Sequence, residues 1–262
     1  MKLVVITGAN GALGKAYIQK FSHIDDYKCV AVSRTKTESK HENVIYIENT
    51  DLLDAYKVKT EIDKKVPIAI CDEILFIHPV GRFKFERWQR PEIDNDKDGI
   101  DDEVYASNCT TFLNVEEPLT LFASQEGSID DFAVCGFGSV SDRYKVPFWL
   151  SYSKAKDVLR QNISTLARQN GKNLKVRGVF INVSSVNTEN ENKLRPNADK
   201  TYWLSPSEIV DDSFDILTQK QRIRNVEMDV FKCIPGFDPE VYYSPQVVWD
   251  RWTHEMGERS EL

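Results

Sequence analysis

The sequence has few cysteines, and their spacing does not suit a metal or disulfide site. An odd count of five, with no Cys-x-x-Cys pair, argues against both a disulfide scaffold and a zinc site. Such a set fits reduced thiols in a cytoplasmic protein. The five are Cys29, Cys71, Cys109, Cys135 and Cys233.

Long apolar runs are also missing. Residues 3–6 form a run of only four apolar side chains before Thr7, whereas a secretory signal needs about 7–15. No stretch approaches the ~20 apolar residues of a membrane span. We therefore expect a cytoplasmic protein that does not bind membranes.

An excess of positive charge is absent as well. The 34 lysines and arginines are outnumbered by 41 acidic residues, giving a net charge of -7. This balance argues against a nucleic-acid partner and favours small ligands that are held locally. Because the sequence shows no repeat, low-complexity tract or linker, we expect residues 1–262 to form one domain.

Short apolar runs alternate with segments of helical spacing along most of the chain. This alternation predicts an α/β protein with a doubly wound parallel sheet, the Rossmann fold. Ser205 and Glu208 form the pattern of a capping box at the start of the last helix that we assign. Strands are predicted at residues 3–6, 29–32, 44–47, 74–77, 132–135, 176–183 and 225–231, and helices at 15–21, 53–65, 106–123, 151–169 and from 206.

A glycine-rich loop lies between the first predicted strand and the first helix. Gly8, Gly11 and Gly14 remove the Cβ atoms that would keep a pyrophosphate from the backbone amides at the helix N-terminus. The alternative is a turn without a ligand. With this position in the chain, the loop predicts a dinucleotide site. Its predicted cofactor contacts are Gly8, Asn10, Gly11, Ala12, Leu13 and Gly14.

The residues after the second strand indicate which dinucleotide binds. An Asp or Glu there would bind the ribose 2′-hydroxyl of NAD, but the sequence has Ser33, Arg34, Thr35 and Lys36. Arg34 suits bidentate contact with a 2′-phosphate, so we predict NADP(H) in preference to NAD(H). Alternatively, Arg34 is an ordinary surface charge.

The residues after the third strand are placed to reach the adenine. Asp51 and Leu52 follow that strand directly and are predicted to contact the adenine edge. Aspartates in this position often only cap the next helix, which is the alternative reading.

Four polar residues form a candidate catalytic set. Tyr152 and Lys156 are four apart on a predicted helix, and an ammonium beside a phenol lowers its pKa toward the range useful for proton transfer. Ser139 follows the fifth strand, at the sheet edge where ligands bind in such folds. Asn108 lies within a predicted helix, where a polar side chain usually faces solvent.

The glycine loop, Asn108, Ser139 and the Tyr152-x-x-x-Lys156 pair together resemble the short-chain dehydrogenase/reductase family over about residues 1–215. The resemblance implies a sheet of seven parallel strands with helices on both faces and a homodimer or homotetramer. It implies that Tyr152 is the general acid/base and that Lys156 binds the nicotinamide ribose. It also implies that Ser139 orients the carbonyl and that Asn108 holds a water molecule.

Three departures from the family pattern affect the cofactor site. The glycine spacing is closer to that of the extended branch. His78, Pro79, Val80 and Gly81 replace the usual Asn-Asn-Ala-Gly, and residues 181–183 stand where a Pro-Gly pair is usual. We still predict that His78, Pro79, Val80 and Val183 contact the cofactor, as do Tyr152 and Lys156.

An acidic segment at residues 94–103 resembles a short calcium loop. Asp94, Asp96, Asp98 and Asp102 alternate with other residues around a glycine, as in loops that supply oxygen ligands. A solvated acidic loop is the alternative, because an EF-hand would need a glutamate where Tyr105 stands.

These features predict an NADP(H)-dependent oxidoreductase that acts on a carbonyl/alcohol pair. A non-catalytic dinucleotide sensor or scaffold on the same fold is the first alternative, and a nucleotide-sugar epimerase or dehydratase is the second. The substrate is expected to contact residues 82–105 and 184–204 and the C-terminal tail, because loops carry specificity in such folds.

Overall fold

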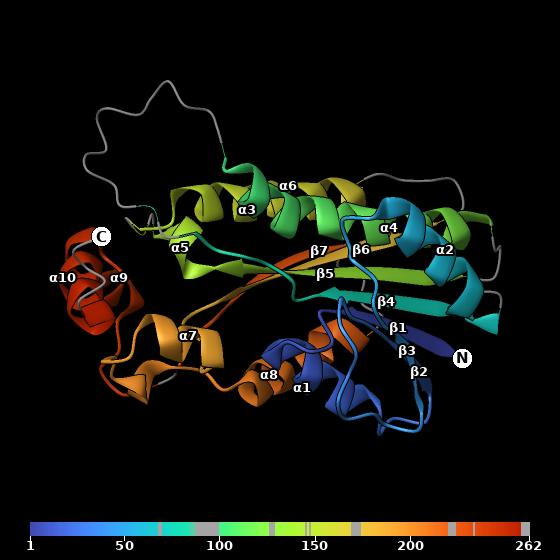
Figure 1. Ribbon diagram of the computed structural model, residues 1–262, viewed down its shortest axis with the longest axis horizontal. Helices are drawn as coiled ribbons and strands as arrows, with labels where there is room; N and C mark the ends of the chain where they lie inside the picture. The colour runs from blue at the N-terminus through green and yellow to red at the C-terminus, as the bar shows by residue number, and fades with distance from the viewer. Residues whose placement is uncertain are drawn as a thin grey trace.

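The structure is a computed structural model that describes residues 1–67, 70–84, 86, 100–125, 129–144, 146, 148–168, 174–219, 224–232 and 234–257. Within these residues, seven parallel strands form one sheet with the order β3-β2-β1-β4-β5-β6-β7 (Figure 1). The predicted doubly wound α/β fold is thus confirmed. The strands are β1 (Lys2–Thr7), β2 (Tyr27–Val32), β3 (Val44–Ile47), β4 (Glu73–His78), β5 (Asp131–Ser139), β6 (Val176–Val183) and β7 (Asn225–Val230).

Helices cover both faces of the sheet (Figure 1). One face carries α2 (Ala55–Lys65), α4 (Thr111–Gln125) and α6 (Leu150–Arg168), and the other carries α1 (Ala12–Phe21) and α8 (Pro206–Thr218). The shorter elements are α3 (Asp102–Tyr105), the π-helical turn η2 (Ala106–Thr110), α5 (Val140–Arg143), α7 (Glu189–Leu194), η3 (Lys200–Tyr202), α9 (Pro239–Tyr242) and α10 (Pro245–Met256). In Figure 1, α7, α9 and α10 lie together beyond one end of the sheet.

The core has one apolar layer on each face of the sheet, because successive strand residues point to opposite sides. Leu3 and Val5 pack in the layer beneath α2, α4 and α6, whereas Val4 and Ile6 pack in the layer beneath α1 and α8. All four are fully buried. A third apolar cluster, which includes Trp149 and Trp252, joins α6 to α10.

β5 is the strand whose end differs most from its predicted position. β5 runs to Ser139 rather than to Cys135, because Gly136 and Gly138 pair with β6 although glycine is disfavoured in strands. A Cβ on Gly138 would lie 2.1 Å from Asn182 Oδ1, so this close pairing requires glycine.

Residues 181–183 also belong to β6, where they pair with both β5 and β7. The strand predicted at residues 176–183 is therefore confirmed. Ser184 and Ser185 are the residues that follow it.

The capping box at α8 is present as predicted, since Ser205 Oγ accepts from the Glu208 amide and the Glu208 carboxylate accepts from the Ser205 amide. In the described part of the chain, no helix is long and apolar enough to cross a membrane.

Candidate active site

The glycine loop brings the backbone of β1 and α1 into close contact. Gly8 has φ +62°, a conformation that side chains rarely adopt, and the Gly11 amide donates to its carbonyl at 2.8 Å. A Cβ on Gly14 would lie only 2.2 Å from the same Gly8 oxygen. The loop therefore keeps the free amides at the start of α1 accessible to an anion.

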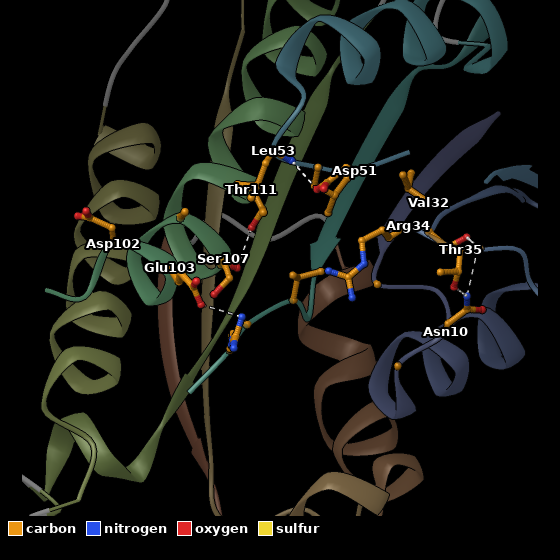
Figure 2. A pocket seen from close by; sticks show the side chains of 18 residues that line it. Asn10, Val32, Arg34, Thr35, Asp51, Leu53, Asp102, Glu103, Ser107 and Thr111 are labelled. Atoms are coloured by element: carbon orange, nitrogen blue, oxygen red, sulfur yellow. Dashed lines mark hydrogen bonds and ion pairs between the residues drawn. The ribbon is translucent and has the colours of Figure 1, made fainter. Parts of the chain in front are cut away.

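A cavity of about 830 Å³ opens beside this loop (Figure 2). Its wall comes from the carboxyl ends of β1, β2, β3 and β4 and from the start of the helical segment after residue 100. Ala12, Leu13, Gly14 and Pro79 are not among the lining residues. The predicted cofactor residues that line it are Gly8, Asn10, Gly11, Ser33, Arg34, Thr35, Asp51, Leu52 and Val80.

Asn10 joins the glycine loop to the segment after β2. Its Nδ2 donates to Thr35 Oγ1 at 2.9 Å and to the carbonyls of Thr35 and Lys36, both at 3.3 Å. Ser33 Oγ donates to the Thr35 carbonyl at 2.7 Å, which fixes the turn further. Arg34 is exposed and extends into the cavity (Figure 2), with no ion-pair partner among the described residues.

Asp51 lies in the wall of the same cavity, and its Oδ1 accepts from the Leu53 amide at 3.1 Å. The N-cap of α2 is instead Asp54, whose side chain accepts from the Lys57 amide. Asp51 therefore does not cap the helix, and its carboxylate faces the ligand space.

The structure brings Tyr152, Lys156 and Ser139 together at the carboxyl end of β5. Tyr152 and Lys156 lie one turn apart on α6, and the Lys156 ammonium is 5.3 Å from the centre of the Tyr152 ring. Ser139 is the last residue of β5, and its hydroxyl lies close enough to that of Tyr152 to affect the pKa of the tyrosine. Lys156 is 3% exposed.

The electrostatics of Tyr152 differ from the prediction. Its pKa is raised rather than lowered, first by burial and then by the nearby Glu191 carboxylate, while the Ser139 hydroxyl opposes the shift. Lys156 lies over the ring face, and burial lowers its own pKa to about 8. Tyr152 is therefore protonated at neutral pH, which suits a proton donor.

Asn108 is fully buried, contrary to the usual exposure of a polar residue within a helix. It lies in the π-helical turn η2, a distortion often found at functional sites. Its Nδ2 donates to the carbonyls of Arg82 and Val104, both at 2.8 Å, and its Oδ1 has no partner among the described residues.

Gly81 lies against both Asn108 and Lys156. A Cβ at this position would be 2.5 Å from Asn108 Oδ1 and 2.8 Å from Lys156 Nζ. The unpartnered oxygen and the ammonium therefore converge on the same point of the cavity wall, and the site lacks room there for any side chain.

His78 lies beneath the cavity wall and is fully buried, so it supports the site instead of lining it. Thr7 Oγ1 is 2.8 Å from its Nδ1, and Thr111 Oγ1 is 3.2 Å from its Nε2. Thr111 already donates to the Ser107 carbonyl, so it accepts from Nε2. Burial and the charge of Lys156 lower the pKa of His78 to about 3.

We expect His78 to make the fold sensitive to acid. In the unfolded chain His78 has its ordinary pKa of 6.5, so it is protonated below pH 6.5. In the folded protein it is protonated only near pH 3, so acid favours the unfolded state. The stability from this neutral histidine is present above pH 6.5 and is lost as pH falls. Between pH 7.5 and 5.5 the loss should be about 1.4 kcal/mol.

Urea unfolding of the wild type, His78→Gln and His254→Gln at both pH values measures this contribution. Between the two pH values, the free energy of unfolding should change by about 1.4 kcal/mol less in His78→Gln than in the wild type. His254→Gln should change as the wild type does, because His254 is exposed. An equal pH dependence in all three proteins would contradict the assignment.

A smaller cavity of about 160 Å³ lies beside Tyr152. Ser139, Tyr152 and Val183 line it, as do Glu191 of α7 and Trp252 of α10, which the sequence analysis did not single out. The segment with Glu191 and the C-terminal tail were both expected to contact the substrate. The sequence did not indicate which of their residues reach Tyr152, because only the fold brings them there.

The acidic segment that resembles a calcium loop is described only at its C-terminal end. Asp94, Asp96 and Asp98 lie outside the described residues. Asp102 begins α3, with Asp101 as its N-cap, and lines the larger cavity. In the described ranges, no cluster of three or more potential ligands could hold a metal ion.

Comparison with known proteins identifies similar folds. No family model and no curated protein sequence matches the chain. An alcohol dehydrogenase from the archaeon Thermococcus sibiricus, solved with 5-hydroxy-NADP, is similar with a TM-score of 0.68 and 19% identity, over 90% of this chain and 100% of that one.

A 3-ketoacyl-(acyl-carrier-protein) reductase from Brucella melitensis, solved with NADH, has a TM-score of 0.67 and 15% identity, over 88% of this chain and 96% of that one. A serine dehydrogenase complexed with NADP+ has a TM-score of 0.68 and 14% identity, over 90% of this chain and 98% of that one. The fold of this chain is therefore similar to that of these solved dehydrogenases and reductases.

Proposed function

We propose that this chain is an NADP(H)-dependent oxidoreductase of the short-chain dehydrogenase/reductase family, which transfers hydride between the nicotinamide and a carbonyl/alcohol substrate. The observation that carries this proposal is the convergence of Ser139, Tyr152 and Lys156. Ser139 and Tyr152 line the small cavity, and Lys156 lies against Gly81 in the wall of the large one. One cavity has the size and glycine loop of a dinucleotide site, and the other is small enough for a small substrate. The dehydrogenases of similar fold, solved with nicotinamide cofactors, support it.

The residues of the large cavity fit a dinucleotide. The amides at the start of α1 and the close Gly8–Gly14 contact suit a pyrophosphate, and the unpartnered Oδ1 of Asn108 beside Lys156 leaves an acceptor for a ligand or water. Bound NADPH would supply the hydride. Lys156 would hold the nicotinamide ribose at this end of the cavity.

Residues of the chain would donate the proton and stabilise the charges that develop during the reaction. The Tyr152 hydroxyl, protonated because its pKa is raised, donates to the carbonyl oxygen as negative charge develops there. Ser139 donates a second hydrogen bond to the same oxygen and so stabilises that charge. The buried ammonium of Lys156 stabilises the phenolate left on Tyr152.

Arg34 supports NADP(H) over NAD(H), because its guanidinium is exposed to the cavity and unpaired among the described residues. We expect Arg34→Ala to raise the Kd for NADPH about 10- to 100-fold, the effect of losing a charge-assisted hydrogen bond. The Kd for NADH should change less than about threefold. Lys65→Ala, on the distant helix α2, serves as the control in fluorescence titrations.

If Arg34→Ala weakens the binding of NADPH and NADH equally, or of neither, then Arg34 does not recognise the 2′-phosphate of NADPH.

The reaction itself is tested by absorbance of NADPH with a panel of aldehydes and ketones, and of NADP+ with the matching alcohols. We expect at least one class of carbonyl compound to consume NADPH in a one-to-one ratio, or the matching alcohols to consume NADP+. Tight cofactor binding without turnover of any compound would overturn the proposal in favour of a non-catalytic sensor, whereas turnover without net cofactor change would favour an epimerase.

A further inference from the structure

The small cavity beside Tyr152 combines aromatic walls with one carboxylate. Phe83 packs edge-on against Tyr152 at 6.3 Å and against Trp149 at 5.1 Å, and Trp149 lies 5.7 Å from Trp252. All four residues line the cavity together with Glu191. A carboxylate in such an aromatic site needs an explanation, because burying a charge is costly unless it is paired.

Arg195 holds the Glu191 carboxylate in place. Its Nε donates to Glu191 Oε1 at 2.9 Å, Nη2 donates to the same oxygen, and Nη1 donates to Glu255 at 3.0 Å. The guanidinium lies between the rings of Trp203, at 4.8 Å, and Trp252, at 4.4 Å. Because the Arg195 side chain is only 1% exposed, Glu191 is fixed in one orientation as a charged group.

This arrangement leaves one oxygen of the Glu191 carboxylate available to accept a hydrogen bond. Both bonds from Arg195 end on Oε1, and Oε2 has no hydrogen-bond partner in the described part of the chain. The carboxylate also lies close enough to Tyr152 to raise its pKa. Arg195 is shared between Glu191 and Glu255, and Arg251 also pairs with Glu255, so Glu191 offers an acceptor oxygen and not an excess of negative charge.

We propose that Glu191 is a specificity-determining residue that selects small carbonyl or alcohol substrates with a hydrogen-bond donor, a hydroxyl or an ammonium, beside the reacting carbon. A carboxylate accepts hydrogen bonds but cannot donate them, so it favours either donor and repels an anion. The volume of about 160 Å³ is below the ~300–1,000 Å³ of typical ligand pockets and restricts the substrate to a small molecule. This inference rests on the proposed reductase function.

Four ketones of similar size test the proposal by their kcat/KM with NADPH: hydroxyacetone, aminoacetone, butanone and pyruvate. In the wild type, hydroxyacetone or aminoacetone should exceed butanone at least tenfold, and pyruvate should be the poorest. The aromatic walls add attraction for a cation, so a lead of aminoacetone over hydroxyacetone identifies ammonium as the preferred donor.

Glu191→Gln removes the charge but keeps the size. It should reduce the advantage of the donor-bearing ketone over butanone at least fivefold and raise kcat/KM for pyruvate. Glu189→Gln is the matched control, because Glu189 lies on the same helix, is 81% exposed and pairs only with Lys193 among described residues. The Kd for NADPH and the melting temperature report whether either variant remains folded.

The outcomes separate this inference from the proposed function. If butanone or pyruvate equals the donor-bearing ketones in the wild type, or if none of the four reacts while other ketones do, Glu191 does not select the substrate. If no carbonyl compound of any class reacts, the reductase function itself is wrong, and the inference fails with it.

Discussion

Replacing Tyr152 with phenylalanine should lower kcat about 10²–10⁴-fold, the usual contribution of a general acid. The variant removes one hydroxyl and keeps the ring that packs against Phe83 and lies below Lys156. The cavity that we assign to the cofactor is lined by other residues, so the Kd for NADPH should change less than about twofold. Stopped-flow absorbance of NADPH and fluorescence titration measure the two quantities separately.

Tyr144→Phe is the matched control for this experiment. Tyr144 follows α5 near Ser139, but its hydroxyl contacts the exposed Glu240 at 3.3 Å and does not line the small cavity. Its kcat should remain within about twofold of the wild type. An unimpaired Tyr152→Phe enzyme would remove Tyr152 from the chemistry.

The second large effect is expected from Gly14→Ala. Within a helix, alanine is normally more stable than glycine by about 1 kcal/mol. Here the added Cβ would lie 2.2 Å from the Gly8 carbonyl oxygen, a backbone atom that cannot move without opening the β1–α1 turn. The clash should outweigh the helix preference and lower the free energy of unfolding by at least about 2 kcal/mol.

Gly11→Ala provides the comparison within the same loop. Its Cβ would be 3.2 Å from the same oxygen, a contact that a shift of a few tenths of an ångström relieves. Urea unfolding should therefore rank the wild type above Gly11→Ala and Gly11→Ala above Gly14→Ala. Equal stability of the two variants would mean that the loop does not have the tight geometry described above.

The fold could be predicted from the sequence because most of its determinants are local. Four-residue apolar runs placed β2, β3 and β4 within about two residues, and Ser205 with Glu208 marked the start of α8. The prediction was wrong where tertiary contact overrides local preference. β5 continues through Gly136 and Gly138 because β6 pairs with them and because Asn182 leaves no space for larger residues.

The proximity of the candidate catalytic residues could be predicted from the sequence, but their electrostatics could not. The helical spacing of Tyr152 and Lys156 correctly put them one turn apart, but spacing does not reveal that the ammonium lies over the ring face. The sequence also could not show that Glu191, 39 positions after Tyr152, approaches it closely enough to raise its pKa. Burial of His78 between two threonines likewise depends on contacts between distant segments.

The most direct test of the central claim is a crystal structure of the protein with NADP+ bound. The account predicts the 2′-phosphate beside Arg34 and the nicotinamide between Lys156 and the small cavity, within reach of a substrate that is hydrogen-bonded to Tyr152 and Ser139. A nicotinamide directed away from Tyr152, or a dinucleotide bound outside the glycine-loop cavity, would contradict it.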